Sequence, residues 1–405
     1  MHDLIKAHHM PVLVAEFGVP ASRGLTHRNA FGMNQGFHSE KEQGQIDARL
    51  FHSIVDEGYA GGLVFTWQDE WFKRTWNTMD FDNSDRRPYW SNMQTNEQHF
   101  GVLGFEPGKK DTSILVDGQA GDWEKAGTKP AYVSKDQQDR LRRVSISSDP
   151  AYLYFLLTFN KPVNLQKQDM YLLLDTKADQ GQTSIPIGNR EKLKTDYGID
   201  FLIKISRTES SRVLVDSYYD SFYYQYGQIL KMIPQKSYAN KKNNGVFHPI
   251  RLALNKELKI PQTGKVIPFQ DYETGLLKFG DANPFHKGFD SLTDISISKD
   301  HKTIEGRIPW QLLNVKDPSL KEVMGDLWRS GLTGSEKTEG IRLAAVETEN
   351  GQVQGSFPQI VNNQINQKDA YIYKWKEWDE PAFYERLKVS YQIMRNLYHT
   401  VEIGE

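Results

Sequence analysis

The sequence predicts an α+β multidomain protein: the end of a parallel (β/α)8 barrel, then a large antiparallel β-sandwich, then a C-terminal helix. Residues 1–105 carry two apolar strand segments with an amphipathic helix between them, the β, α, β order of a parallel sheet. Residues 106–380 carry many short strand segments separated by turn residues, which is typical of antiparallel sheets. Residues 381–405 place apolar side chains at helical spacing. We expect these three ranges to be the structural units.

Composition narrows the class of protein. Of the 405 residues, 38% are hydrophobic and 25% are charged, which is ordinary for a globular protein. The formal net charge is −2 and no run of basic residues occurs, so nucleic acid is not an expected partner. No apolar stretch is long enough to cross a bilayer, so we expect no membrane segment. The absence of cysteine excludes disulfides and thiol chemistry, and it is compatible with an exported protein.

The first unit is predicted from apolar periodicity and capping residues. A helix is expected near residues 40–57, because Ser39 and Glu42 have the spacing of a capping box and apolar residues recur on one face. A second, shorter helix is expected over residues 88–98, with Pro88 in its first turn. Strands are predicted at residues 12–15 and 62–66, and the buried face of the long helix at Ile46, Leu50, Ile54 and Val55.

The first strand should be fully buried, and it ends in a lone carboxylate, Glu16, followed by Gly18. In (β/α)8 barrels the chemistry gathers at the carboxyl ends of the strands, so this position favours catalysis over packing. The alternative is a carboxylate that caps the next turn or pairs with Arg23 or Arg28. A barrel needs about 250 residues, so we expect most of it to lie upstream of Met1 and the chain to be a C-terminal fragment.

The second unit is a series of predicted strands without a fixed repeat. Residues 217–227 are rich in aromatic side chains, which would form a ligand platform. Alternatively, if the segment is a strand, every second ring would point inward and belong to the core. Trp123 and Trp310 are expected in the core. Strands are predicted at residues 145–146, 152–159, 170–175, 199–205, 211–219, 294–298, 303–309, 340–346 and 370–375, and the terminal helix carries Phe383, Leu387, Tyr391, Met394 and Leu397.

The segment Ala-Glu-Phe-Gly around Glu16 and the segment Phe-Thr-Trp-Gln-Asp-Glu-Trp that ends at Trp71 resemble the last two βα units of a clan A glycoside hydrolase barrel. The resemblance implies that Glu16 is the nucleophile and that Trp67 lies beneath the sugar. Asp69, Glu70 and Trp71 would then bind substrate. Retaining hydrolysis takes two carboxyls about 5–5.5 Å apart, and the family's acid/base lies on an earlier strand that has no counterpart before Glu16. Upstream barrel strands are therefore expected to be required for catalysis, and the fragment alone to be inactive.

Three further segments resemble the β-sandwich of family 9 carbohydrate-binding modules, over residues 111–375. In residues 116–123 an Asp-Gly turn leads into an Asp-Trp pair, like the entry motif of such domains. Residues 151–155 and 170–176 are similar to the family's paired strands, and residues 303–310 to its edge strand. This resemblance implies a fold, and a fold does not by itself fix a function.

No cofactor is expected. The histidines do not have the spacing of a zinc site. Calcium is the one metal that the sequence leaves open, because oxygen donors stand in several turns, although turn formation explains them as well and their spacing differs from that of an EF-hand. These donors are Asp117, Asp122, Asp175 and Asp179.

Two functions remain open on the sequence. In the first, the chain is the C-terminal part of a carbohydrate-active protein, a retaining glycoside hydrolase with an appended β-sandwich, located outside the cell or on its surface. Its partner would be an oligosaccharide or polysaccharide. In the second, the product is a non-catalytic glycan-binding or cell-surface structural protein. We prefer the first, and a complete barrel upstream of Met1 would distinguish them.

Overall fold

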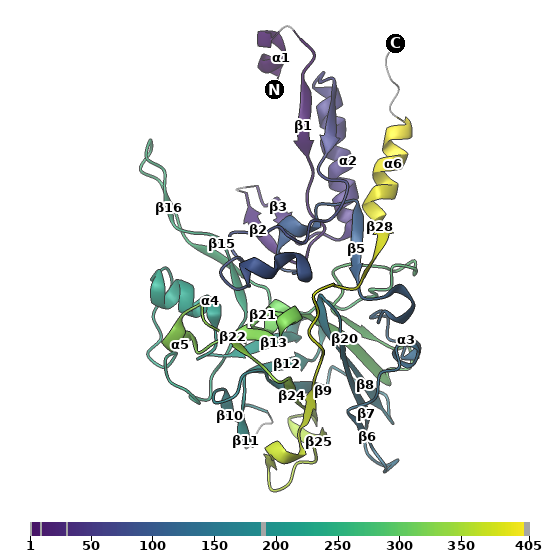
Figure 1. The fold of residues 1–405 in the computed structure, drawn as a ribbon, viewed down its shortest axis with the longest axis vertical. Coiled ribbons are helices and arrows are strands. Elements are labelled where there is room, and N and C mark those ends of the chain that lie inside the picture. The colour runs from purple at the N-terminus through teal and green to yellow at the C-terminus, as the bar shows by residue number, and fades with distance from the viewer. Residues whose placement is uncertain (1, 9, 30, 188–191, 401–405) are drawn as a thin grey trace.

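The structure, a computed structural model, describes residues 2–8, 10–29, 31–187 and 192–400. It is β-rich, built from several mostly antiparallel sheets with few helices (Figure 1). The predicted antiparallel region is thereby confirmed. The predicted parallel region is present as a single β-α-β unit, and the residues described form no closed barrel.

The N-terminal unit follows the predicted order. Strands β1 (Leu13–Phe17) and β4 (Gly61–Val64) pair in parallel, and helix α2 (Glu40–Asp56) connects them along the chain. The helix begins at the predicted capping box. The Glu42 backbone N–H donates to the Ser39 hydroxyl, and the Ser39 backbone N–H donates to the Glu42 carboxylate at 2.7 Å. These two bonds satisfy N–H groups that a helix start would leave unpaired.

The prediction of one terminal helix over residues 381–405 is wrong in its first part. Strand β28 (Phe383–Leu387) pairs antiparallel with β5 (Leu103–Pro107). Helix α6 (Val389–Thr400) follows it and lies beside α2 (Figure 1). The spacing of Phe383 and Leu387 fits one face of a helix and one face of a strand equally well, so only the pairing with β5 decides between them. Residues 401–405 lie outside the part that the structure describes.

The buried face of helix α2 is predicted only in part. Ile54 is buried as predicted. Leu50 and Val55 are exposed, whereas Asp47 and Phe51, which lie outside the predicted face, are buried. The cause is α6, which packs on α2 and β1 in one apolar cluster and selects the face that it covers. The packing of α6 on α2 therefore decides which face of α2 is buried, and the number of apolar residues on a face does not.

The chain path places the β-rich region inside the N-terminal unit. The chain leaves through β5, builds the large sheets, and returns through β28 to α6. The predicted appended arrangement is thereby corrected to an insertion, because α6 packs on the β-α-β unit and not on the large sheets. The two-stranded ribbon of β5 and β28 joins the two regions (Figure 1).

Two large antiparallel sheets share one hydrophobic core, which contains the predicted core residue Trp310. Trp123, also predicted to be core, is fully buried in a neighbouring cluster. The five-stranded sheet has the order β19 (Ile295–Ile297), β20 (Thr303–Pro309), β8 (Tyr152–Phe159), β7 (Leu141–Ser148) and β6 (Tyr132–Val133). The seven-stranded sheet has the order β14 (Phe247–Pro249), β13 (Arg212–Asp216), β12 (Phe201–Ile205), β9 (Gln168–Asp175), β24 (Ile341–Glu349) and β25 (Gln352–Phe357), with β27 (Tyr371–Tyr373) also on β24.

Smaller ribbons and short helices complete the described chain. The predicted helix over residues 88–98 is replaced by short 3-10 turns at Ser84–Tyr89 and Asn96–His99, because side chains such as Gln98 bond the local backbone. The ribbons are β2 (Leu25–Arg28) with β3 (Asn34–Gly36), β10 (Gln182–Ile185) with β11 (Leu193–Ile199) and β26 (Gln364–Ile365), β15 (Arg251–Asn255) with β18 (Gln270–Glu273), β16 (Leu258–Lys259) with β17 (Val266–Ile267), and β21 (Val315–Asp317) with β22 (Glu322–Met324) and β23 (Ser335–Lys337). The other α-helices are α1 (His2–His8), α3 (Gly121–Lys125), α4 (Ser221–Tyr223) and α5 (Leu327–Ser330).

The close approach of α2 and α6 gives a first prediction. A Cβ atom on Gly44 would lie 2.7 Å from the Cα of Ser390, so Gly44→Ala should force the two helices apart. We expect a loss of about 1–3 kcal/mol in the free energy of unfolding, measured by chemical denaturation. Gly121→Ala is the matched control, because nothing lies within 4 Å of its added Cβ. Equal stability of the two variants would contradict the packing.

Candidate functional site

Glu16 lies in β1 where the strand pairing is irregular. Val14 opposes Gly62 and Phe17 opposes Val64, so β1 holds one residue more than β4 between these pairs. Such a bulge changes the direction of the side chains within it. The side chain of Glu16 is exposed, as is that of Ala15 beside it. The prediction of a fully buried strand is therefore wrong at this point.

The two faces of the β1–β4 pair differ. Val14 and Phe17 pack in the cluster formed with α2 and α6. Leu13 precedes Val14 on β1 and Leu63 precedes Val64 on β4, and these two side chains are 50% and 56% exposed. Glu16 lies within the bulge and is exposed like them.

No charge neutralises Glu16 among the residues that the structure describes. The two arginines that could pair with it are engaged elsewhere. Arg23 binds Asp294, with Nε and Oδ1 3.0 Å apart, and Arg28 donates to Asn34 at 3.1 Å. The packing alternative that the sequence left open is thereby unsupported.

Trp67 follows the neighbouring strand β4, and its side chain is 56% exposed. Its ring makes an edge contact with Tyr391 of α6, with centroids 6.1 Å apart. The ring of Trp67 therefore lies against the helix layer, and no contact among the described residues joins it to Glu16.

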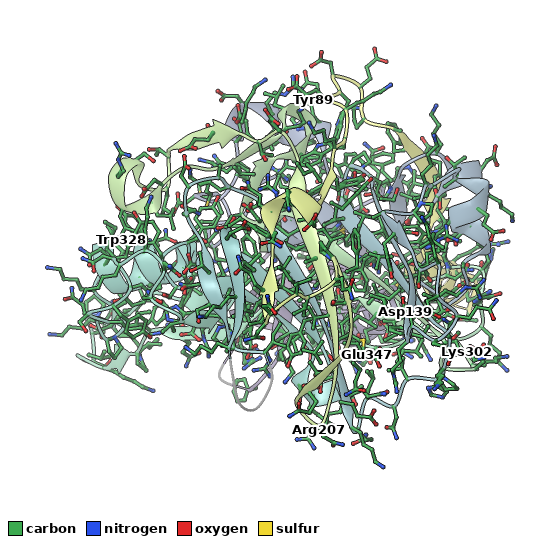
Figure 2. The ribbon with its side chains drawn as sticks, turned by 90° about the horizontal axis from the view of Figure 1, so that it is seen from below. Tyr89, Asp139, Arg207, Lys302, Trp328 and Glu347 are labelled. Carbon is green, nitrogen blue, oxygen red and sulfur yellow. The ribbon has the colours of Figure 1, made fainter. Side chains whose placement is uncertain are left out.

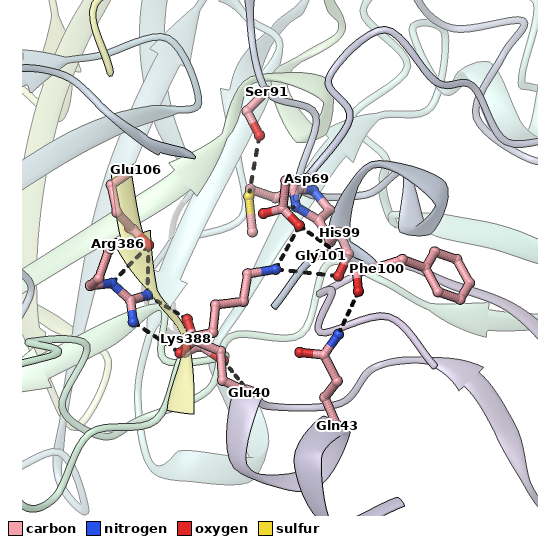
Figure 3. Close-up of polar contacts among 12 residues, drawn as sticks. Glu40, Gln43, Asp69, Ser91, His99, Phe100, Gly101, Glu106, Arg386 and Lys388 are labelled. Carbon is pink, nitrogen blue, oxygen red and sulfur yellow. Dashed lines mark hydrogen bonds and ion pairs between the residues drawn. The ribbon is translucent and has the colours of Figure 1, made fainter. Parts of the chain in front are cut away.

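Asp69 is buried in an ion-pair cluster (Figure 3). Its carboxylate accepts from Lys388 Nζ at 2.7 Å and from the Gly101 backbone N–H at 3.0 Å, and His99 lies 3.9 Å away. Burial by itself would raise the pKa of Asp69, but Lys388 and His99 outweigh it, so the pKa lies below its usual range. This carboxylate is anchored to the protein, contrary to the predicted role in sugar binding.

The other two predicted substrate residues have different surroundings. Trp71 is 6% exposed and packs edge-on against Phe383 of β28, so it belongs to the core. Glu70 is partly exposed and pairs with Lys73 at 2.9 Å. Of the acids in this loop, Glu70 is the one that a ligand could reach.

A second ion cluster joins the start of α2 to β28 (Figure 3). The Arg386 guanidinium binds Glu40, and it binds Glu106 on β5 at 2.6 Å. Glu40 also accepts from the Val389 N–H at 2.9 Å, so one carboxylate serves the N-terminal ends of α2 and α6. Burial alone would lower the pKa of Arg386, but the two carboxylates raise it above its usual value.

Two polar residues on α2, which the sequence pattern did not single out, hold the turn after Glu16. The Val19 N–H donates to Asp47 Oδ1 at 3.0 Å, and Gln43 Nε2 donates to the Val19 carbonyl at 3.0 Å. Gln43 also donates to the carbonyl of Phe100 at 3.1 Å. Burial is the main cause that raises the pKa of Asp47 to about 7. The spacing of this pair, one helical turn apart, is the signal that could have marked it.

The tyrosine-rich segment after Ser217 is not a ligand platform. Tyr218, Tyr219, Tyr223 and Tyr226 are at most 5% exposed. The segment turns into helix α4 and a π-helical turn, contrary to the strand predicted through residue 219, and the hydroxyl of Tyr218 bonds Asp326 at 2.7 Å.

The entry motif at residues 116–123 is held by a buried acid. Glu305 accepts from the backbone N–H of Asp117 and Gly118 at 3.1 and 2.9 Å and from the indole of Trp123. Burial raises the pKa of Glu305 well above its usual value. Asp122 likewise accepts backbone N–H groups, and within the described ranges no group of three acids, histidines or cysteines forms a candidate metal site.

No family model matches the chain, and no curated protein matches its sequence. Among the helices described, none has the length and apolar character needed to cross a membrane.

The Asp69–Lys388 pair gives the second prediction. Lys388→Met would leave a buried carboxylate without its cation, and we expect a loss of about 3–5 kcal/mol in the free energy of unfolding. Lys337→Met breaks the exposed pair with Glu377, 3.1 Å long, and should cost at most about 1 kcal/mol. Adding Asp69→Asn to Lys388→Met should restore part of the free energy of unfolding that the single variant loses. A single-variant effect as small as that of the control would contradict the buried pair.

Asp47 gives a pH-dependent prediction. Its pKa is about 7 in the folded chain against an ordinary value of 3.8, so between these values the unfolded chain loses the proton first and stability falls as the pH rises. Asp47→Asn cannot titrate at this position, so the free energy of unfolding of this variant should fall less between pH 4 and pH 7 than that of the unchanged chain. The two falls should differ by up to about 4 kcal/mol. Unfolding curves of both proteins across this range test the point. Parallel pH profiles would refute the raised pKa.

Proposed function

We propose that this chain is the C-terminal part of a retaining glycoside hydrolase and that Glu16 is the nucleophile. The observation that carries the proposal is the position of Glu16: an exposed carboxylate with no ion-pair partner among the described residues, at a bulge near the carboxyl end of a parallel strand. The carboxyl ends of parallel strands are where α/β barrels place their chemistry. The resemblance of residues 15–18 and 65–71 to a clan A barrel supports the same assignment.

The reaction needs a second carboxyl group. Glu16 would attack the anomeric carbon, and an acid about 5–5.5 Å away would protonate the leaving oxygen and later activate water. We infer that further parallel strands supply this acid. Two observations support them: β1 and β4 pair only with each other in the described sheet, and Leu13 and Leu63 expose apolar surface on these two strands.

The predicted substrate residues divide by accessibility. We propose Glu70 as a sugar contact, because its side chain is partly exposed and carboxylates accept from sugar hydroxyls. Trp67 is exposed, and we assign it an outer position, away from Glu16. Asp69 and Trp71 are buried and support the loop.

The β-rich region fits the same proposal. We infer that its two large sheets form the sandwich that residues 111–375 resemble, that of family 9 carbohydrate-binding modules, and that the protein acts on an oligosaccharide or polysaccharide outside the cell or on its surface. The composition without cysteine supports the location.

The test is covalent trapping of the nucleophile in the cellular polypeptide that contains these residues. A 2-deoxy-2-fluoro glycosyl fluoride should label Glu16, as read by peptide mass spectrometry, because the fluorine slows release of the glycosyl-enzyme. Glu16→Gln should lose the label and lower hydrolysis about a thousandfold or more, since it removes the nucleophile and keeps the shape. Glu70→Gln is the comparison and should retain the label. Full hydrolysis by Glu16→Gln, or a label on another acid, would sink the assignment.

A further inference from the structure

Two aspartates lie next to each other at one end of the seven-stranded sheet. Asp200 directly precedes β12 and Asp216 ends β13, and these strands pair with Phe201 opposite Val215. The Asp216 N–H donates to the Asp200 carbonyl at 2.7 Å. Because Phe201 and Val215 point into the main core, the two aspartates point to the other face of the sheet. Both aspartates are 0% exposed.

A small sheet, which we call the cover layer, packs on that other face. It consists of β10, β11 and β26, and its Ile185 belongs to one apolar cluster with Leu202 of the large sheet. Figure 1 shows β10 and β11 at the lower end of the molecule, and Figure 2 views the molecule from this end. Trp328, labelled in Figure 2, marks the side of Asp216, because its indole donates at 3.0 Å to the carbonyl of Tyr218, whose N–H donates to Asp216.

Hydrogen bonds, and no ion pair with the described residues, hold the carboxylate of Asp200. It accepts from the backbone N–H groups of Thr176 and Lys177, both at 2.9 Å, and from the Thr176 hydroxyl at 3.1 Å. The amide of Gln180 donates to it at 3.3 Å. The loop that leads from β9 to the cover layer is therefore anchored on this one buried carboxylate.

Two buried oxygens at the aspartate pair have no donor. Asp216 Oδ1 accepts from Gln182 Nε2 and from the Tyr218 N–H, but Oδ2 has no hydrogen-bond partner in the described chain. Gln180 Oε1 has none either, although the same amide bonds Asp200. A carboxylate can only accept hydrogen bonds, whereas a carboxylic acid has one O–H to donate. A proton bound at the pair would supply a donor that the described residues do not.

The nearest cations are engaged by other acids. Asp175 at the end of β9 lies beside Asp200, and it takes the guanidinium of Arg342 on β24, with Nη1 and Oδ2 2.6 Å apart. The ammonium group of Lys177 pairs with Glu336 at 2.7 Å. The charge of neither cation is therefore left for Asp200.

The surroundings of Asp216 add negative charge. Asp220 at the start of α4 disfavours the ionised form of Asp216, and it is itself bonded to His248 on β14 at 2.8 Å. The other charged or titratable groups around the three aspartates are Tyr197 of β11, Asp179, Tyr218, Tyr219, Lys242, Asp326, Lys337 and Glu339.

Burial makes both aspartates weaker acids. It raises the pKa of Asp216 to about 7, and the hydrogen bonds from Tyr218 and Gln182 offset it only in part. Asp200 and Asp220 raise this pKa further. Burial likewise raises the pKa of Asp200 above its usual range. Like charges on neighbouring strands and a low local dielectric therefore act in the same direction.

The cover layer depends on the two aspartates at its first strand. Gln182, the first residue of β10, bonds Asp216, and Gln180 just before it bonds Asp200. A Cβ atom on Gly198 of β11 would lie 1.5 Å from the Gln180 carbonyl oxygen, so the loop and β11 touch backbone to backbone. A change at the aspartate pair is therefore passed directly to both long strands of the layer.

We propose that a proton held by Asp200 and Asp216 keeps the cover layer closed, and that the layer opens as the pH rises and this proton is lost. In the open layer both carboxyl groups meet water and ionise at their ordinary pKa of 3.8. Opening therefore becomes easier from about pH 4 to about pH 7 and changes little above that range. Opening exposes the apolar face of the large sheet around Leu173 and Leu202. The pair thus links pH to the exposure of an apolar surface.

Hydrogen exchange of the 405-residue chain, read by peptide mass spectrometry and corrected for the intrinsic effect of pH, tests the proposal. In peptides from residues 182–187 and 192–199 the opening equilibrium constant should rise about fiftyfold between pH 5 and pH 7.5. Asp216→Asn should reduce this rise by about tenfold or more, because the amide cannot ionise and places N–H groups where Oδ2 lacks a donor. Asp111→Asn, at an exposed aspartate in the turn Lys110–Thr112, is the control and should behave as the unchanged chain does.

The same data contain the outcomes that would overturn the switch. The pH profiles of the unchanged chain and of Asp216→Asn could coincide in β10 and β11, which would remove the role of the pair. Protection that follows added Ca²⁺ at constant pH, and stays constant from pH 5 to pH 7.5 in a chelator, would replace the proton by a cation. If Asp216→Asn does not fold, the unchanged chain decides: a rise in β10 and β11 that is absent from β8 and β20 supports the switch, and a flat profile refutes it.

Discussion

Buried ion pairs of Arg386 in β28 and of Lys388 just after it hold the two halves of the molecule together. Arg386 joins Glu40 on α2 to Glu106 on β5, and Lys388 neutralises Asp69 in the loop after β4. Buried charges are costly unless each one has a partner, so the cluster specifies one register for β28 against β5. The position of α6 follows from that register, because Val389 begins the helix and donates to Glu40. Without this cluster nothing local in the sequence would bring the chain end back to its beginning.

The insertion of the β-rich region between β5 and β28 explains why it is fixed to the first unit. Besides the ribbon, Arg23 reaches across with its whole guanidinium: it binds Asp294 and donates to the carbonyls of Thr274 and Leu276, both at 2.7 Å. An arginine that is 5% exposed and fully bonded resists rearrangement. The large sheets are therefore held at a set position next to the loops of the candidate site, and are not a module on a free linker.

The same unit shows two kinds of carboxylate. Asp47 and Asp69 are buried, bonded to backbone N–H groups, and hold the turns that follow β1 and β4. Glu16, in β1, is exposed and has no bonded partner among the described residues. This contrast, more than the motif, separates Glu16 from its neighbours.

Local patterns in the sequence determined the elements that local forces make. The capping box at Ser39, the order β, α, β, and the strands at Tyr152–Phe159 and Thr303–Pro309 depend on hydrogen bonds and periodicity within a few residues, and all are present. Contacts between distant segments decided the rest. They decided the pairing of β28 with β5, the face of α2 that is buried, the burial of the tyrosines and the engagement of Asp69 by Lys388, each of which joins residues far apart in the chain. Spacing along one segment carries no information about which distant segment will cover it, and so only the tertiary structure could settle which side chains stay accessible.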